Sequence, residues 1–176
     1  GVGELLKACQ PKQALGVELD LSTVAEARTK YSLPIEHWDG TSDVSARLLE
    51  KMPDGADYIL LVNAVGYWSD IETALKKIAP LCRPHTRVIA VYYNFLWALP
   101  FRIAQKLRLK MPQPDQNWLS ASDVANLFRL SNYRVVKQGY RCLLPTNLGP
   151  LSWFFNRFVA NLPVLSRLGC THFVVA

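Results

Sequence analysis

Two continuous apolar runs constrain this chain more than any other feature of its sequence. Residues 57–64 are DYILLVNA and residues 87–93 are RVIAVYY, and both are short and rich in β-branched or aromatic side chains. A strand covered on both faces has this uninterrupted pattern, whereas a half-exposed strand alternates apolar and polar residues. Helix-like segments lie between and around the two runs. Strands that alternate with helices predict an α/β fold with a doubly wound, mainly parallel sheet.

The other expected elements fit a single domain over residues 1–176, a length that suits one sizeable core. Further strands are expected at 14–19, 33–38, 133–144 and 171–176. Helices are expected at 3–9, 22–30, 44–51, 70–79 and from Ser120 or Ser122 to 130, with Ser22 capping the second of them. Because the last two strands lack the regular spacing, we expect them to form an antiparallel edge.

Two segments do not belong to this alternation, and we expect them to cap a substrate site. Residues 94–118 contain an amphipathic stretch with basic and apolar side chains on neighbouring faces, and residues 147–168 are rich in aromatic residues and leucine. Both lie after strands, and open α/β sheets bind ligands at the carboxyl ends of their strands. For residues 96–110, a lid helix packed on the core is favoured over a helix lying at a membrane interface.

Charge is distributed unevenly along the chain. Residues 1–72 carry a net charge of −6, and residues 73–176 carry +12 with Asp115 and Asp123 as the only acids. This polarity suggests that the first half meets a cationic or hydroxyl-rich ligand and the second half an anionic one. A basic, solvated surface would give the same count and stays open as an alternative.

Cysteine spacing and hydropathy exclude several classes of protein. The four cysteines form no CxxC pair, so we expect buried thiols in a reducing compartment, with neither a zinc site nor a disulfide framework. No signal peptide is evident. The longest apolar stretch, 88–101, is interrupted by Asn94 and Pro100 and is shorter than the roughly 20 residues that span a bilayer. The expected location is cytoplasmic, with peripheral contact at a membrane as an open alternative.

Glycines and acids at successive strand ends are the main functional signal. Gly1 and Gly3 form a GxG turn before a helix, a weak sign of a nucleotide loop because Leu6 stands where a dinucleotide fingerprint has glycine. Glu18 ends the first expected strand, where a carboxylate can accept hydrogen bonds from two ribose hydroxyls. Asp39 ends the second, where a carboxylate can accept from an adenine amine. Each acid alone is more often a solvated loop residue, but their joint placement favours a nucleoside-type ligand.

The order of these features resembles the class I S-adenosylmethionine-dependent methyltransferases, with a domain similar to those of type 11/12. The matching stretches are GVG (1–3), GVELD (16–20), WDG (38–40), DYILLVNAVGYWSD (57–70) and ALKKIAPLCRPHTRVIAV (74–91). The family's Leu-x-Pro-Gly-Gly turn before the fifth strand is replaced here by LCRPHTR, which loosens the match away from the cofactor site. The resemblance implies S-adenosylmethionine as cofactor and a seven-stranded Rossmann-like sheet with an antiparallel last strand.

The resemblance also implies roles for particular residues. The expected cofactor contacts are Gly1, Gly3, Glu18 on the ribose, Leu19, Asp39 on the adenine amine, Gly40 and Asn63. The expected substrate contacts are Tyr67, Tyr93 and Asn94. No catalytic base is assigned, and the candidates are His37 and Tyr67, which stands where many relatives carry a histidine. No metal is expected.

Methyl transfer to a small-molecule or lipid- or glycan-linked acceptor, anionic in charge, is the favoured function. One alternative is a nicotinamide-dependent oxidoreductase, against which Leu6 and Asp39 argue. Another is a methyltransferase-fold binding domain without catalysis. Nucleic acid is disfavoured as a substrate, because NAVG (63–66) stands where many enzymes that modify amino groups carry an Asn-Pro-Pro-Tyr-like tetrad.

In this family the first strand lies at the centre of the sheet, between the second and the fourth. The residues of that strand are not in this sequence, and GVG corresponds to the last part of the cofactor loop. The resemblance therefore predicts a sheet without its first central strand, two unpaired backbone ladders and weak binding of the cofactor.

Overall fold

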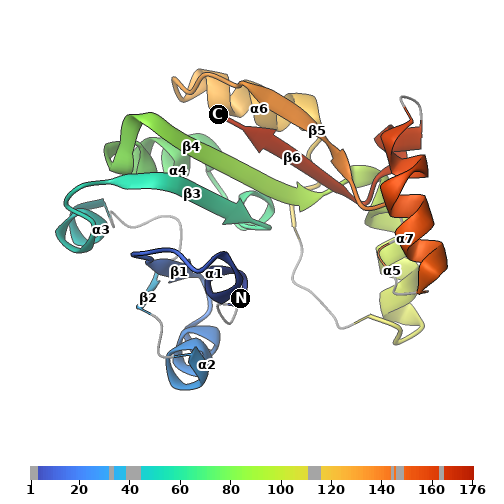
Figure 1. Ribbon diagram of the computed structural model, residues 1–176, viewed down its shortest axis with the longest axis horizontal. Helices are drawn as coiled ribbons and strands as arrows, with labels where there is room; N and C mark the ends of the chain where they lie inside the picture. Colours follow the sequence, from blue (N-terminus) through green and yellow to red (C-terminus); the bar gives the residue numbers. More distant parts are fainter. Residues whose placement is uncertain are drawn as a thin grey trace.

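The computed structural model describes residues 4–31, 34–38, 45–110, 116–143, 145, 149–162 and 165–176 (Figure 1). The strands in these ranges are β1 (Gly16–Glu18), β2 (Ile35–His37), β3 (Ala56–Val62), β4 (Cys82–Tyr93), β5 (Lys137–Arg141) and β6 (Thr171–Val175). The α-helices are α1 (Glu4–Cys9), α2 (Leu21–Tyr31), α3 (Ser45–Lys51), α4 (Ile71–Ile78), α5 (Ala98–Lys106), α6 (Ala121–Leu130) and α7 (Pro150–Arg157). Short 3-10 helices are η1 (Val65–Tyr67), η2 (Ala79–Leu81), η3 (Phe95–Trp97), η4 (Val159–Asn161) and η5 (Leu165–Leu168).

The strands form two sheets, one of two strands and one of four. In the smaller sheet β1 pairs in parallel with β2. In the larger sheet the order is β3-β4-β6-β5, where β3 and β4 are parallel and β6 is antiparallel to both of its neighbours. The α/β class and the antiparallel last strand are confirmed. The expected antiparallel edge is confirmed as well, because the last two strands, β6 and β5, pair antiparallel at one end of the sheet, with β5 outermost.

An open edge of β3 separates the two sheets. Within the part of the chain that the structure describes, β3 pairs only with β4, and no strand lies between β3 and β1. Tyr58, Leu60 and Val62, which alternate along one face of β3, are 67%, 40% and 46% exposed. The sequence predicted a sheet that lacks its first central strand. The structure shows this as two separate sheets, β1-β2 and β3-β4-β6-β5.

The main core lies between the larger sheet and helices α4 and α6. Leu75 of α4, together with Val124 and Phe128 of α6, is fully buried there. A separate, smaller cluster of Val24, Ala27 and Ile35 packs α2 against β2. The two sheets therefore have largely separate hydrophobic cores.

Polar side chains begin three of the helices. Asp70 caps α4. At the start of α6, Ser120 and Asp123 form a reciprocal capping box, so Ser120 is the cap of the two serines that the sequence offered. The predicted cap of α2 at Ser22 is wrong, because the backbone amide of Thr23 donates to the carboxylate of Asp20 at 2.8 Å.

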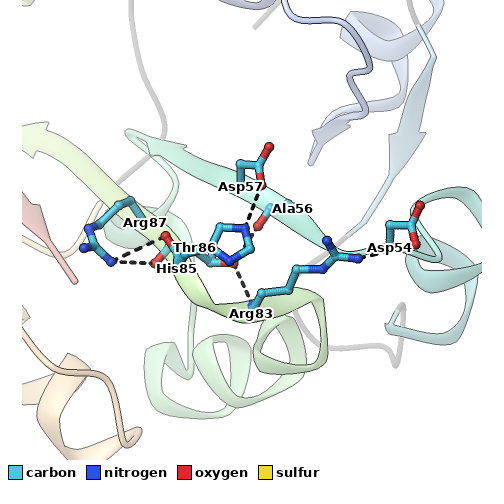
Figure 2. A network of polar contacts seen from close by, with 7 residues as sticks. All are labelled: Asp54, Ala56, Asp57, Arg83, His85, Thr86 and Arg87. Atoms are coloured by element: carbon cyan, nitrogen blue, oxygen red, sulfur yellow. Dashed lines mark hydrogen bonds and ion pairs between the residues drawn. The ribbon is translucent and has the colours of Figure 1, made fainter.

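Strand β4 begins at Cys82, whereas the sequence predicted a start at residue 87. A bulge of four residues in β4 separates its first pair with β3 from the rest of the ladder. The register jumps at residues 83–86, between the pairs Ala56–Cys82 and Tyr58–Arg87. The hydroxyl of Thr86 donates to the carbonyl of Ala56 and accepts from the amide of Arg83 (Figure 2). The ring of His85 lies 2.9 Å from the carboxylate of Asp57 in the same network. Pro84, His85 and Thr86, which belong to the LCRPHTR stretch that replaces the family's glycine turn, therefore lie beside the amino-terminal end of β3.

Candidate functional site

The carboxyl ends of β1, β2 and β3 meet at a pair of tryptophans. Trp38 follows β2, and its backbone amide donates to the carbonyl of Glu18, the last residue of β1, at 3.0 Å. Its buried ring lies 5.8 Å from that of Trp68, which follows η1 after β3. These contacts place Glu18, the residue predicted to bind the ribose, on the same side of the molecule as the end of β3.

Glu18 is held in position by its neighbours at the end of β1. Its Oε1 accepts a hydrogen bond from the amide of Leu19 at 2.8 Å. The carbonyl of Leu19 lies 3.0 Å from Nε2 of His37 on β2, and because a carbonyl only accepts, Nε2 carries the donated proton. His37, a candidate base, thereby ties the ends of the two strands together and fixes the backbone beside Glu18.

The turn after β3 brings Asn63 and Tyr67 to the same end. Asn63 has a φ of 54°, in the left-handed region that asparagine tolerates better than most residues, and its amide donates to the carbonyl of Val91 at 2.7 Å. The chain then turns into η1. The carbonyl of Gly66 in this turn accepts from the amide of Asn117 at 2.7 Å, so the segment before α6 packs against η1.

Tyr67 and Tyr93 face a common region beside these strand ends. Burial raises the pKa of the Tyr67 phenol, and the neighbouring Tyr93 raises it further. A phenol with a raised pKa is neutral at physiological pH, so it offers a hydrogen-bond donor and acceptor and is a poor base. The site geometry thus favours a positioning role for Tyr67 over the role of a base.

An aromatic cluster centred on Phe101 of α5 borders Tyr93. The ring of Phe101 lies 5.1 Å from that of Tyr93, 5.7 Å from Trp97 and 6.4 Å from Trp118. The ammonium of Lys110 lies 5.0 Å from the centre of the Phe101 ring, and burial lowers the pKa of this lysine. The described parts of segment 94–118, residues 94–110 and 116–118, therefore contribute aromatic contacts beside the end of β4.

Asn94, the residue after β4, connects three parts of the backbone through its side chain. Its side chain is fully buried, and its amide nitrogen donates to the carbonyls of Arg167 and Gly169 at 2.9 and 2.8 Å. Its side-chain oxygen accepts from the amide of Leu96 at 3.1 Å. With these bonds the side chain joins β4, η3 and η5.

Four of the predicted cofactor contacts lie outside the described residues, namely Gly1, Gly3, Asp39 and Gly40. The predicted contacts Glu18, Leu19, Asn63, Tyr67 and Tyr93 all lie at or after strand ends. Sequence reasoning missed the tryptophans that connect these ends. Their only sequence signal was their place beside polar strand ends, in WDG and in YWSD.

A cavity of about 540 Å³ lies apart from these strand ends. It is lined by residues of β5, η4, η5 and the first turn of α6, including Tyr140, Arg141 and Arg167, and by none of the predicted site residues. It therefore adds no residue to the candidate cofactor site.

The described residues form neither a metal site nor a membrane-spanning helix. No group of three or more His, Cys, Asp or Glu residues in them could hold a metal ion. No helix in these ranges combines the length and hydropathy needed to cross a membrane. All four cysteines lie in the described ranges as free thiols. Cys170 is buried, Cys82 and Cys142 are half-buried and Cys9 is exposed, so the expectation of buried thiols is confirmed for Cys170 alone.

Comparison with known proteins gives a match in structure alone. No family model and no curated protein matches the chain. A chain from the complex of the Haloferax volcanii Trm112 methyltransferase activator with a methyltransferase superposes with a TM-score of 0.66 at 16% identity, over 99% of this chain and 77% of that one. A Mesorhizobium loti S-adenosylmethionine-dependent methyltransferase gives a TM-score of 0.64 at 12% identity, over 99% and 86%. One from Archaeoglobus fulgidus gives 0.63 at 14% identity, over 100% and 81%. The described chain therefore has the fold of the class I S-adenosylmethionine-dependent methyltransferases.

Proposed function

We propose that the chain binds S-adenosylmethionine at the carboxyl ends of β1 and β3 and transfers its methyl group to an anionic small-molecule or lipid- or glycan-linked acceptor. The observation that carries this proposal is the fixed position of Glu18. Its backbone is tied through Leu19 to His37, and Trp38 and Trp68 bring it to the side where β3 ends. In an open α/β sheet this is the place where a ligand binds.

The described side chains fit the chemistry of such a cofactor. The Glu18 carboxylate only accepts hydrogen bonds when ionised, which suits the two hydroxyls of a ribose. The half-buried Leu19 offers an apolar surface beside it, and Asn63, the residue after β3, has a side-chain amide that can both donate and accept. When bound, the cofactor supplies an electrophilic methyl group on a sulfonium.

The chain's own contribution to the reaction is then positioning and exclusion of water. Tyr67 and Tyr93 would orient the acceptor, because both border the end of the sheet and the raised pKa keeps Tyr67 neutral. The aromatic cluster around Phe101 would shield that region from solvent. Lys110, held over the rings of Phe101 and Tyr93, offers a positive charge for an anionic acceptor.

The test is calorimetric titration of the chain with S-adenosylhomocysteine. We expect saturable, weak, one-to-one binding. Glu18→Gln should weaken this binding by about 1–3 kcal/mol, because charge-assisted hydrogen bonds to the ribose are lost. Glu26→Gln, which removes an exposed carboxylate on α2, is the matched control and should leave the affinity unchanged.

Three outcomes would contradict the proposal or its assignment of Glu18. A chain that is folded by circular dichroism but gives no heat with S-adenosylhomocysteine does not bind the cofactor. Binding of NAD⁺ in place of S-adenosylhomocysteine would favour the oxidoreductase alternative. Normal binding by Glu18→Gln would show that the assignment of the ribose ligand is wrong.

A further inference from the structure

Large apolar side chains lie exposed on the helices beyond the end of β4. On α5 and the turn after it, Leu99, Ile103 and Leu107 are 66%, 49% and 63% exposed. On α7 and the residue after it, Trp153, Phe154 and Phe158 are 63%, 49% and 53% exposed. We call these six exposed side chains, on two helices at one end of the molecule (Figure 1), the apolar end face. Monomeric soluble proteins rarely expose so many large apolar residues together, so such a face indicates an interaction site.

Both helices are amphipathic with the apolar stripe turned outward. Leu99, Ile103 and Leu107 are spaced four residues apart and so share one face of α5, while Phe101 points to the aromatic cluster on the other side. On α7 the rings of Phe154 and Phe158 lie 5.4 Å apart on the exposed side, whereas Ser152 is buried. The inward faces of both helices pack against the rest of the chain. The outward faces pack against no other element among the described residues.

The two parts of the apolar end face are joined to one scaffold. The indole nitrogen of Trp97, just before α5, donates to the carbonyl of Leu168 in η5 at 2.9 Å. The buried Asn94 adds its two bonds to the carbonyls of Arg167 and Gly169. Figure 1 draws α5 and α7 at the same end of the molecule, away from α2 and α3.

Every charged side chain that the structure describes on α5, on α7 and in the turns after them is positive. Residues 94–114 and 124–176 contain no acidic residue. Exposed basic side chains flank the apolar stripes, with Arg102, Lys106 and Arg108 on and after α5 and Arg157 on α7. A partner must therefore offer an apolar interior and a negative surface at the same time.

We propose that the apolar end face docks on the surface of an anionic phospholipid bilayer. The bilayer interface accepts leucine and aromatic side chains among its acyl chains, and anionic headgroups attract the flanking arginines and lysines. A second copy of the chain fits less well, because a symmetric contact through this face would bring two wholly cationic surfaces together. This inference is independent of the proposed function, because it rests on exposed side chains and charge and needs no cofactor.

The test is co-sedimentation of the 176-residue chain with two sets of vesicles, one of pure phosphatidylcholine and one of phosphatidylcholine mixed with the anionic lipid phosphatidylglycerol. We expect binding to the anionic vesicles, little binding to the neutral ones, and weakening in high salt. Leu99→Ser with Trp153→Ser should lower the partition coefficient by at least about tenfold, because both side chains leave the acyl region. Arg102→Glu with Lys106→Glu should lower it by more than about tenfold on anionic vesicles.

A matched control uses equally exposed residues elsewhere. Leu21 on α2 and Leu130 on α6 are 66% and 64% exposed, against 66% and 63% for Leu99 and Trp153. Leu21→Ser with Leu130→Ser should therefore bind vesicles like the parent chain. Circular dichroism verifies that each variant is folded.

Three results would overturn the proposal. The first is absence of binding to either kind of vesicle by a folded chain. The second is equal binding by the Leu99 and Trp153 variant and its control. The third is a dimer in light scattering that Leu99→Ser with Trp153→Ser converts to monomer, which would make the face an interface between two chains.

Discussion

At the scale of single residues, His172 is the clearest case of a buried polar group without compensation. It is 2% exposed between Tyr92 and Tyr140, whose rings lie 5.4 and 4.5 Å from it. No described residue lies within hydrogen-bonding distance of either ring nitrogen, and burial lowers its pKa to about 4. The imidazole is therefore neutral in the folded chain at physiological pH.

His172 should make the stability of the chain depend on pH. The unfolded chain takes up a proton near pH 6.5, whereas the folded chain does so only near pH 4. The free energy of unfolding should then fall as pH drops through this window, by up to about 3 kcal/mol. Urea denaturation between pH 7 and pH 4.5 measures this change.

His172→Phe should remove most of that slope, because the unfolded chain then has no proton to gain at this position. His85→Gln is the control and should keep the slope, since His85 is exposed. An unchanged slope in His172→Phe would show that other groups cause it.

The positions of the candidate residues could be predicted where they depend on strand ends, but their distant contacts could not. Glu18 and Tyr67 were placed at strand ends because each follows an apolar run. The burial of Asn94 was not predicted, because its hydrogen-bond partners lie 73 and 75 residues further along the chain. No local pattern reports partners at that distance.

At the scale of elements, the start of α6 is fixed by local chemistry. Ser120 accepts from the amide of Asp123, and the carboxylate of Asp123 accepts from the amide of Ser120. This carboxylate has a lowered pKa because of the Ser120 side chain first and its backbone amide second. The helix thus begins where its first polar pair can satisfy two otherwise free amides.

Ser120→Ala should lower the free energy of unfolding by about 1 kcal/mol, because the cap is lost. Ser69→Ala, at an exposed serine outside this capping pair, is the control and should change the free energy by a few tenths of a kcal/mol at most, about the usual range for a surface substitution. Chemical denaturation at pH 7 measures both. Equal effects of the two substitutions would contradict the role assigned to Ser120.

Strand predictions were accurate in the apolar centres and failed at irregular ends. The run at 57–64 became β3 at Ala56–Val62, within two residues at each end. The run at 87–93 proved to be the second part of β4, which starts at Cys82 before the bulge. That bulge depends on a bond from Thr86 to Ala56, 30 residues away, which hydropathy alone does not predict.

At the scale of the whole molecule, the two sheets are only loosely coupled. The smaller sheet has its own cluster of buried residues. Trp38, the residue after β2, packs in the main core and so connects the two parts. The sequence predicted six of the strands and the α/β class, since both depend on local pattern. The separation into two sheets followed from the family resemblance, because hydropathy does not reveal a missing neighbour.

The loose coupling should be visible in hydrogen exchange. We expect the amides of β1 and β2 to exchange through a local opening of lower free energy than those of β4 and β6. Trp38→Ala should accelerate exchange in β1 and β2 while leaving β6 nearly unchanged. Trp153→Ala, at an exposed position, is the control, and uniform protection across both sheets in the parent chain would contradict the expectation.

The open edge of β3 has a consequence for the behaviour of the chain in concentrated solution. Residues 56–62 are ADYILLV, with no proline or lysine to discourage pairing, and among the described residues that edge has no partner. An apolar strand of this length with high β propensity is a template for the same strand of another copy. Recovery of monomer after refolding should therefore decline as protein concentration rises, in a competition between intramolecular folding and edge-to-edge aggregation.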